Sequence, residues 1–234
     1  MTTEQRATEQ RAPRLPRLAP SDLDEAQRAL YDSIVGGPRA RGPQLFRLTG
    51  DDGALEGPFN AMLHSPAVGA DLQRLGVAVR YGTGFTDRTR EIAILLVAAA
   101  WASDFERYAH EAIGRDVGLT DGELANLAAC RVPGTCGDVE SLVAEVVLAL
   151  TQGQDLDDEL YARAVDRLGS GGLYELTVLV GYYATLALQL RVFRVPAPPP
   201  DPAPGDLTTR GPGRPSRSGR PLLNAFRRGT KGHP

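Results

Sequence analysis

The chain is poor in the residues and segments on which several large classes of protein depend. Only two of its 234 residues are cysteines, Cys130 and Cys136. This is too few for the disulfide framework of a small secreted protein, and it fits a reducing cytoplasm. The first eighteen residues lack the apolar core of a secretory signal, and no apolar run reaches the ~20 residues that span a bilayer. We therefore expect a soluble, cytoplasmic protein with no membrane partner.

A strong excess of one charge is also missing. The formal net charge is −3, which argues against nucleic acid as a partner of the folded part. The basic residues are unevenly placed, however. From Pro198 onward seven arginines and lysines accompany two aspartates, so this segment carries +5 and the remainder about −8. The body of the protein is thus expected to be acidic and its C-terminal end basic.

Composition divides the chain into three parts. Residues 1–18 contain the tandem repeat "TEQRATEQRA" and a proline-interrupted stretch, which predict a disordered arm. Residues 198–234 are rich in proline, glycine and arginine and predict a disordered tail, because proline lacks an amide donor and glycine loses much entropy on folding. This tail is either an interaction segment or an extension without a role. Residues 19–197 predict one helical domain.

Within that domain the pattern is helical throughout and predicts an all-α fold, a compact bundle of about seven or eight helices. The segment "TREIAILLVAAAWA" is apolar on all sides in its second half, which is typical of a central buried helix. Thr120 and Glu123 have the spacing of a capping box, and Ser65 precedes a proline at the first position of a predicted helix. No segment alternates like a strand. Residues 38–59 form one long irregular loop, and loops of that length are often functional.

The stretch "WASDFERYAH" at residues 101–110 has two interpretations. Ser103 and Glu106 have the spacing of a capping box, in which each side chain satisfies a backbone amide of the other residue. Glu106 and His110 are also four residues apart and therefore share a helix face, where a carboxylate raises the pKa of an imidazole and fixes its tautomer. Spacing alone favours the cap, but the cap leaves His110 unexplained. The two interpretations are compatible.

Two further titratable residues are ambiguous. Glu91 lies directly before a long apolar run, and its simplest explanation is a first-turn glutamate that complements the helix dipole and pairs with Arg88 or Arg90. His64 precedes a predicted helix start, where it either flanks the cap or faces a pocket. Tyr182 and Tyr183 are expected to pack in the core or in an interface rather than contact a substrate.

The order Glu91, Ser103, Glu106, His110, within "TREIAILLVAAAWASDFERYAHEAIGRDVGLTDGELANL", resembles the carboxymuconolactone decarboxylase and alkylhydroperoxidase-D-like superfamily. The segments "GPFNAMLHSP" and "GYYATLALQLRVFRVP" extend the resemblance over roughly residues 18–196. It implies an all-helical fold that assembles into homo-trimers or homo-hexamers, with the site near a subunit interface.

One departure from the superfamily pattern decides which branch is resembled. The peroxidase branch carries a Cys-x-x-Cys pair at the positions that Ser103 and Glu106 occupy here. Serine and glutamate cannot cycle through a sulfenic acid and a disulfide. Cys130 and Cys136 follow a different predicted helix and are poor substitutes. The sequence therefore resembles the decarboxylase-type branch, which lacks the cysteine pair.

That branch implies a decarboxylase-like lyase of aromatic-compound catabolism, which removes CO2 from a carboxylated lactone or a related intermediate by general acid–base chemistry. His110 would be the general acid with Glu106 behind it, and Glu91 would orient His110 or act as a second acid–base group. An arginine should hold the carboxylate of the substrate. The candidates for substrate contact are Ser103, His64, Arg90 and Arg107. No metal and no organic cofactor is implied. The alternatives are a thiol-dependent antioxidant, which the missing cysteine pair disfavours, and a non-catalytic helical oligomer that binds a ligand or a partner protein.

Overall fold

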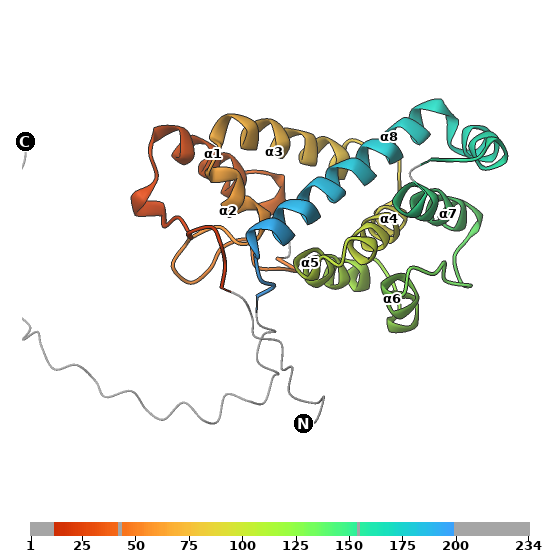
Figure 1. Cartoon of the computed structure of the whole chain (residues 1–234), viewed down its shortest axis with the longest axis horizontal. Helices are drawn as coiled ribbons and strands as arrows, with labels where there is room; N and C mark the ends of the chain where they lie inside the picture. The colour runs from red at the N-terminus through yellow and green to blue at the C-terminus, as the bar shows by residue number, and fades with distance from the viewer. Residues whose placement is uncertain (1–11, 42–43, 154, 199–234) are drawn as a thin grey trace, which may run out of the picture. The chain divides into compact units, whose positions relative to one another are not determined.

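The computed structural model describes residues 12–41, 44–153 and 155–198. These residues form eight α-helices and two short 3-10 helices, and the only β-type pairing among them is an isolated bridge between Thr49 and Leu55 (Figure 1). The prediction of an all-α bundle of seven or eight helices is confirmed. Most of the two predicted arms, residues 1–11 and 199–234, lies outside the described residues, so the predicted domain limits stay predictions.

The first three helices pack against one another. They are α1 (Glu25–Val35), α2 (Pro58–Leu63) and α3 (Pro66–Tyr81). The short 3-10 helices are η1 (Pro20–Asp22), before α1, and η2 (Pro38–Ala40), after it. α1 begins with a capping box between Asp24 and Gln27, and α3 begins with Pro66 at its first position, as its sequence predicts. The long loop between η2 and α2 therefore starts and ends within this group of helices.

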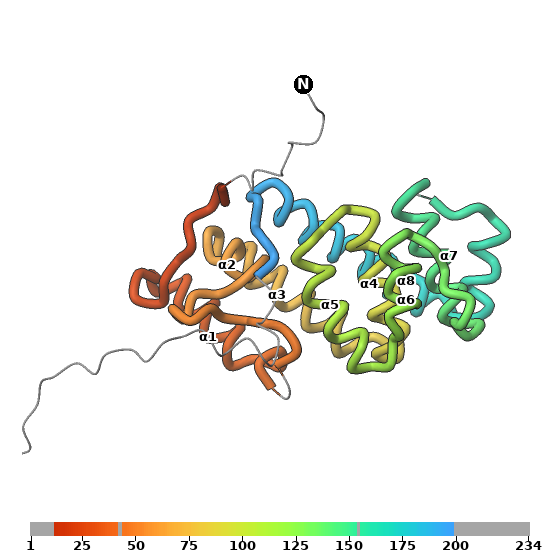
Figure 2. The backbone as a smooth tube through the Cα atoms, turned by 90° about the horizontal axis from the view of Figure 1, so that it is seen from below, coloured from red at the N-terminus to blue at the C-terminus, as the bar shows by residue number. Residues whose placement is uncertain are grey.

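Helix α4 (Asp87–Ala100) is the centre of the second group. It contacts α5, α6, α7 and α8, whose bounds are Asp104–Asp116, Asp121–Ala128, Asp138–Gln152 and Asp158–Phe193 (Figures 1 and 2). Ile92, Ile94 and Leu96 of α4 have no exposed surface. The helix that is apolar on all sides is thus buried on all sides, which confirms the predicted central helix.

Helix α8 joins the two groups, because it packs against α2 and α3 as well as α4 and α7 (Figure 1). It is kinked at Gly169, whose φ of 70° and ψ of 163° favour glycine. By length and composition α8 is a candidate membrane span, but 44% of its most apolar window is buried in this fold. The core helices of soluble proteins pass the same test.

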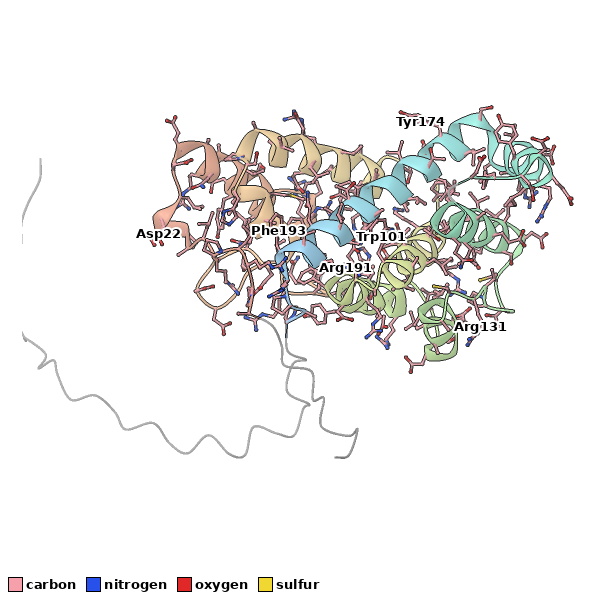
Figure 3. The ribbon with its side chains drawn as sticks, viewed as in Figure 1. Asp22, Trp101, Arg131, Tyr174, Arg191 and Phe193 are labelled. Atoms are coloured by element: carbon pink, nitrogen blue, oxygen red, sulfur yellow. The ribbon has the colours of Figure 1, made fainter. Side chains whose placement is uncertain are left out.

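The described part of the predicted N-terminal arm, residues 12–18, contacts the helices. The backbone N–H of Arg14 donates to the carbonyl of Phe193 at 2.9 Å, at the end of α8 (Figure 3 labels Phe193). The side chain of Asn60 accepts from the N–H of Leu18 and donates to the carbonyl of Pro16. Asn60 of α2 therefore holds this stretch of backbone against the body.

Candidate active site

The turn between α4 and α5 places the predicted Ser103–Glu106 motif, and it does not form a capping box. Trp101 (labelled in Figure 3) is the C-cap of α4, Ala102 has a φ of 50°, and Ser103 is the N-cap of α5. The Ser103 hydroxyl accepts no hydrogen bond from the helix, and both carboxylate oxygens of Glu106 lack a hydrogen-bond partner. Ser103 has a ψ of 96°, whereas the N-cap Thr120, whose predicted box with Glu123 does form, has a ψ of 159°. The capping interpretation of Ser103 and Glu106 is therefore wrong.

Three buried or partly buried side chains are linked in a row: Arg80, Glu91 and His110. His110 Nδ1 is 2.6 Å from Oε2 of Glu91, and Nη1 of Arg80 donates to Oε1 of the same carboxylate at 3.1 Å. Glu91 is 2% exposed and His110 8% exposed. The carboxylate that contacts His110 is therefore that of Glu91 on α4, and not that of Glu106 one turn away on α5. The partner of Glu91 is likewise Arg80 of α3 rather than Arg88 or Arg90.

Three arginines were candidate partners of Glu91 or of the substrate, and all three make their contacts elsewhere. Arg88 forms ion pairs with Glu123 and Glu140. Arg90 pairs with Asp87 and donates to two backbone carbonyls before α4, and Arg107 is half-exposed on α5. The structure does not bring Arg90 or Arg107 to His110.

Glu106 and His110 both line one small cavity of about 30 Å³. This volume holds one or two water molecules. The cavity is lined by residues of the loop after α1 and of α2, α3, α5 and α8: Arg39, Phe46, Pro58, Phe59, Arg80, Phe105, Glu106, Ala109, His110, Tyr182, Tyr183 and Leu186. Ser103 is buried beside it but is not part of its lining.

The environment of His110 favours the neutral imidazole. Burial lowers the pKa of His110, and the nearby Arg80 and Arg39 lower it further, although Glu91 opposes them. Burial acts to raise the pKa of Glu91, but His110 and Arg80 outweigh burial and lower it. We therefore assign the ion pair to Arg80 and Glu91. Nδ1 of His110 then donates to Glu91, and Nε2 is the unprotonated ring nitrogen.

Glu106 has the opposite character. It is 3% exposed, neither of its oxygens has a hydrogen-bond partner, and burial raises its pKa to about 8. The Ser103 hydroxyl acts to lower this pKa, but it makes no hydrogen bond of good geometry with the carboxylate. A carboxyl group with this pKa is mostly protonated at pH 7, so the cavity contains a neutral carboxylic acid beside a neutral imidazole.

Two tyrosines support the imidazole and line the cavity. The ring of Tyr183 packs edge-on against His110 with centroids 5.2 Å apart, and Tyr182 packs edge-on against Tyr183 at 5.1 Å. The guanidinium of Arg39 lies 3.5 Å from the Tyr182 hydroxyl. These tyrosines are buried in the core, as predicted, and both also line the cavity.

The two arginines that line the cavity, Arg39 and Arg80, were not predicted from the sequence. Arg39 and Phe46 come from the long loop at residues 38–59, whose length was the one signal for them. Arg80 lies near the end of α3 and gives no signal of its own, because an arginine in the last turn of a helix is common.

The remaining candidates lie apart from this cavity. His64 is the C-cap of α2, its Nε2 is 3.0 Å from the carbonyl oxygen of Pro16, and it lines a different cavity with Leu15 and Phe193. Cys130 and Cys136 are free thiols outside the His110 cavity, and burial raises the pKa of Cys136. Within the described ranges no group of three or more metal-binding side chains is found.

Comparison with known proteins supports the fold. No family profile and no curated protein sequence matches the chain. Among solved structures, the fold is similar to that of a protein of unknown function from Agrobacterium tumefaciens, described as a putative antioxidant defence protein AhpD. The TM-score is 0.54 at 18% sequence identity, over 59% of this chain and 96% of that chain. Over the aligned part, the helical body therefore shares the fold of that protein.

Proposed function

We propose that the chain is an enzyme that performs general acid–base catalysis on a small organic substrate at the His110 cavity. More finely, we propose a decarboxylase-like lyase that acts on a carboxylated lactone or a related intermediate of aromatic-compound catabolism. One observation carries the proposal: the buried Glu106 carboxyl, without a partner, lines the same cavity as the imidazole of His110. Two titratable groups whose environments push their pKa values apart are typical of an acid and a base.

The proposed roles follow from the contacts of each group. Glu106 is the proton donor, since it is the protonated group in the cavity. His110 accepts a hydrogen bond at Nε2 and positions the water that restores this proton, with Glu91 fixing its tautomer and orientation at 2.6 Å. Arg80 keeps Glu91 ionised and so acts through it. This assignment differs from the sequence-based expectation, in which His110 was the acid and Glu106 its support.

These groups can supply every proton that the decarboxylation needs. The bond between the ring carbon and the substrate carboxylate breaks, CO2 leaves, and the electron pair enters the unsaturated lactone. The resulting dienolate carbon takes the proton of Glu106. A water that donates a hydrogen bond to Nε2 of His110 then returns a proton to the Glu106 carboxylate, and the hydroxide that remains combines with the released CO2 to give bicarbonate. Because the cavity is about 30 Å³, side chains at its mouth must move to admit a lactone.

Thiol-dependent antioxidant activity is less well supported. The AhpD description belongs to the Agrobacterium protein, whereas both cysteines of this chain lie outside the cavity that His110 lines. The predicted homo-trimer or homo-hexamer and the predicted cytoplasmic location remain proposals. Light scattering coupled to size-exclusion chromatography would measure the number of subunits.

The test uses γ-carboxymuconolactone, with CO2 release and loss of lactone absorbance as readouts. We expect His110→Ala and Glu106→Gln each to lower kcat about 10²–10⁴-fold, the usual contribution of a positioned acid or base. Glu111→Gln is the matched control, because Glu111 is on the same helix but pairs with Arg107 and Arg115 outside the cavity. Turnover that is equal in all four proteins would place the chemistry elsewhere. No turnover by the wild type would reject this substrate and favour the non-catalytic binding protein.

A further inference from the structure

Arg39 is an arginine without a counter-ion at the wall of the cavity. Among the described residues no carboxylate lies within ion-pair distance of its guanidinium, and its buried Nε makes no hydrogen bond. Its polar contact is the Tyr182 hydroxyl at 3.5 Å, and its guanidinium lies over the ring of Phe59 at 5.4 Å. A partly buried cation without an anion is costly, so its presence points to a missing anionic partner.

A second cavity lies on the outer side of the same arginine. It has a volume of about 120 Å³, and three of its lining residues, Arg39, Phe46 and Arg80, also line the His110 cavity. These three side chains therefore form the partition between the two cavities. The outer cavity is also lined by Arg41, which is exposed, and by Tyr81. A ligand that enters from the outer cavity reaches Arg39 before it reaches His110.

Two charged residues, Arg39 and Arg80, line both cavities, and among the described residues only Arg80 has a neutralising partner; the exposed Arg41 adds a further positive charge to the outer cavity alone. Arg80 is neutralised by Glu91, while His110 and Glu106 are uncharged for the reasons given above. Arg39 is left as the one uncompensated charge that both cavities share. One guanidinium matches one carboxylate, with two parallel hydrogen bonds, better than it matches a doubly charged phosphate ester, which requires more donors.

We infer that Arg39 binds one carboxylate of a small organic ligand at the partition between the two cavities. The body of that ligand enters the inner cavity, whose wall is mainly apolar and includes Phe46, Pro58, Phe59, Phe105, Ala109 and Leu186. The ligand is thus a compact carboxylate whose body is apolar or aromatic. The inference rests on the proposed function only in placing the reactive end of the ligand next to His110, and binding itself is measurable without turnover.

The experiment is isothermal titration calorimetry on the full-length protein with two probes of equal shape, furan-2-carboxylate and furan-2-carboxamide. We expect the acid to bind at least about tenfold more tightly than the neutral amide, because only the acid pairs with the guanidinium. Arg39→Gln should remove that preference, and Arg39→Lys should restore part of it. Arg47→Gln is the matched control, since Arg47 is in the same loop, pairs with Asp51 and lines neither cavity.

The location of binding is read from the imidazole signals of His110, assigned by their loss in His110→Ala. They should shift on addition of furan-2-carboxylate to wild type and stay unchanged in Arg39→Gln. Equal affinity for acid and amide, unchanged acid binding in Arg39→Gln, or no binding by a folded wild type would each overturn the inference.

If the wild type shows binding that depends on Arg39 but no turnover, the proposed reaction fails and this inference stands. If Arg39→Gln turns over a carboxylated substrate with unchanged KM, the inference fails and the proposed reaction stands.

Discussion

Glu91 and His110 lie on two successive helices, and their Oε2 and Nδ1 atoms meet at 2.6 Å in the interior of the fold. Arg80, from α3, donates a hydrogen bond to the other oxygen of the Glu91 carboxylate. The pair is thus held from three helices, and its geometry depends on how these helices pack. The buried ion pair between Arg80 and Glu91 is costly to desolvate, but removing only one of its two charges costs far more.

Glu91→Gln should destabilise the fold strongly for that reason. The substitution keeps the shape of the side chain but leaves Arg80, whose side chain is 16% exposed, without its anion. We expect a loss of about 3–5 kcal/mol in the free energy of unfolding, measured in urea. The double variant Arg80→Met/Glu91→Gln should recover part of this loss, because it removes both charges. A loss below about 1 kcal/mol for Glu91→Gln would mean that water already solvates the pair.

The contrast between Glu106 and Glu91 shows which parts of the site the sequence could predict. Glu106 and His110 were found because both lie on one helix at a spacing of four, and periodicity places such residues on one face. The hydrogen bond from His110 to Glu91 spans 19 residues and depends on the turn at Ala102, whose φ of 50° no spacing rule foresees. Arg39 lies in the short 3-10 helix η2, at the start of a segment in which the sequence shows no helical periodicity.

The fold was more predictable than the site. Its helices are marked by apolar periodicity and by caps such as Thr120, which act locally. Ser103 has the same local pattern but a different backbone angle, so its side chain does not cap. Local rules therefore placed the helices, while tertiary packing decided which polar side chains meet.

Glu106 should make stability fall as the pH rises. Its pKa in the folded protein is about 8, above the 4.5 of an ordinary glutamate, so the folded state holds a proton that the unfolded state releases. The contribution is complete below about pH 4.5 and is lost as the pH rises towards 8. Glu106→Gln mimics the protonated form, and we expect it to be more stable than wild type at pH 9 by up to about 5 kcal/mol. Urea unfolding at pH 5 and pH 9 measures this, and a stability difference that is the same at both pH values would contradict the buried, unpaired state of Glu106.

Gly76 has no side chain, and Tyr182 and Arg39 occupy the space that a Cβ at this position would fill. A Cβ added at Gly76 would overlap the Tyr182 hydroxyl and lie 2.6 Å from Nη2 of Arg39. Gly76→Ala should therefore destabilise the protein by about 1–3 kcal/mol, although alanine is the better helix former. Gly181→Ala, in α8, is the control: a Cβ there meets nothing within 4 Å, and we expect a gain of roughly 0.5–1 kcal/mol. Tyr182→Phe in the Gly76→Ala background should restore part of the loss, and equal stabilisation by both alanines would refute the packing.

Glu123 should give the opposite dependence on pH, because its carboxylate is fully engaged. Arg88, the backbone N–H of Thr120 and the hydroxyl of Thr135 all bond it, and these partners lower its pKa to about 2. Its contribution is present above about pH 4.5 and is lost as the pH falls through 2. The stability advantage of wild type over Glu123→Gln should therefore be smaller at pH 3 than at pH 6 by roughly 1–2 kcal/mol, measured by urea unfolding. Because the Glu106 effect lies at higher pH, the two variants test separate regions of the same curve. An advantage that does not shrink between pH 6 and pH 3 would show that Glu123 stays equally charged in the folded and unfolded chains, and that the bond with Arg88 contributes little.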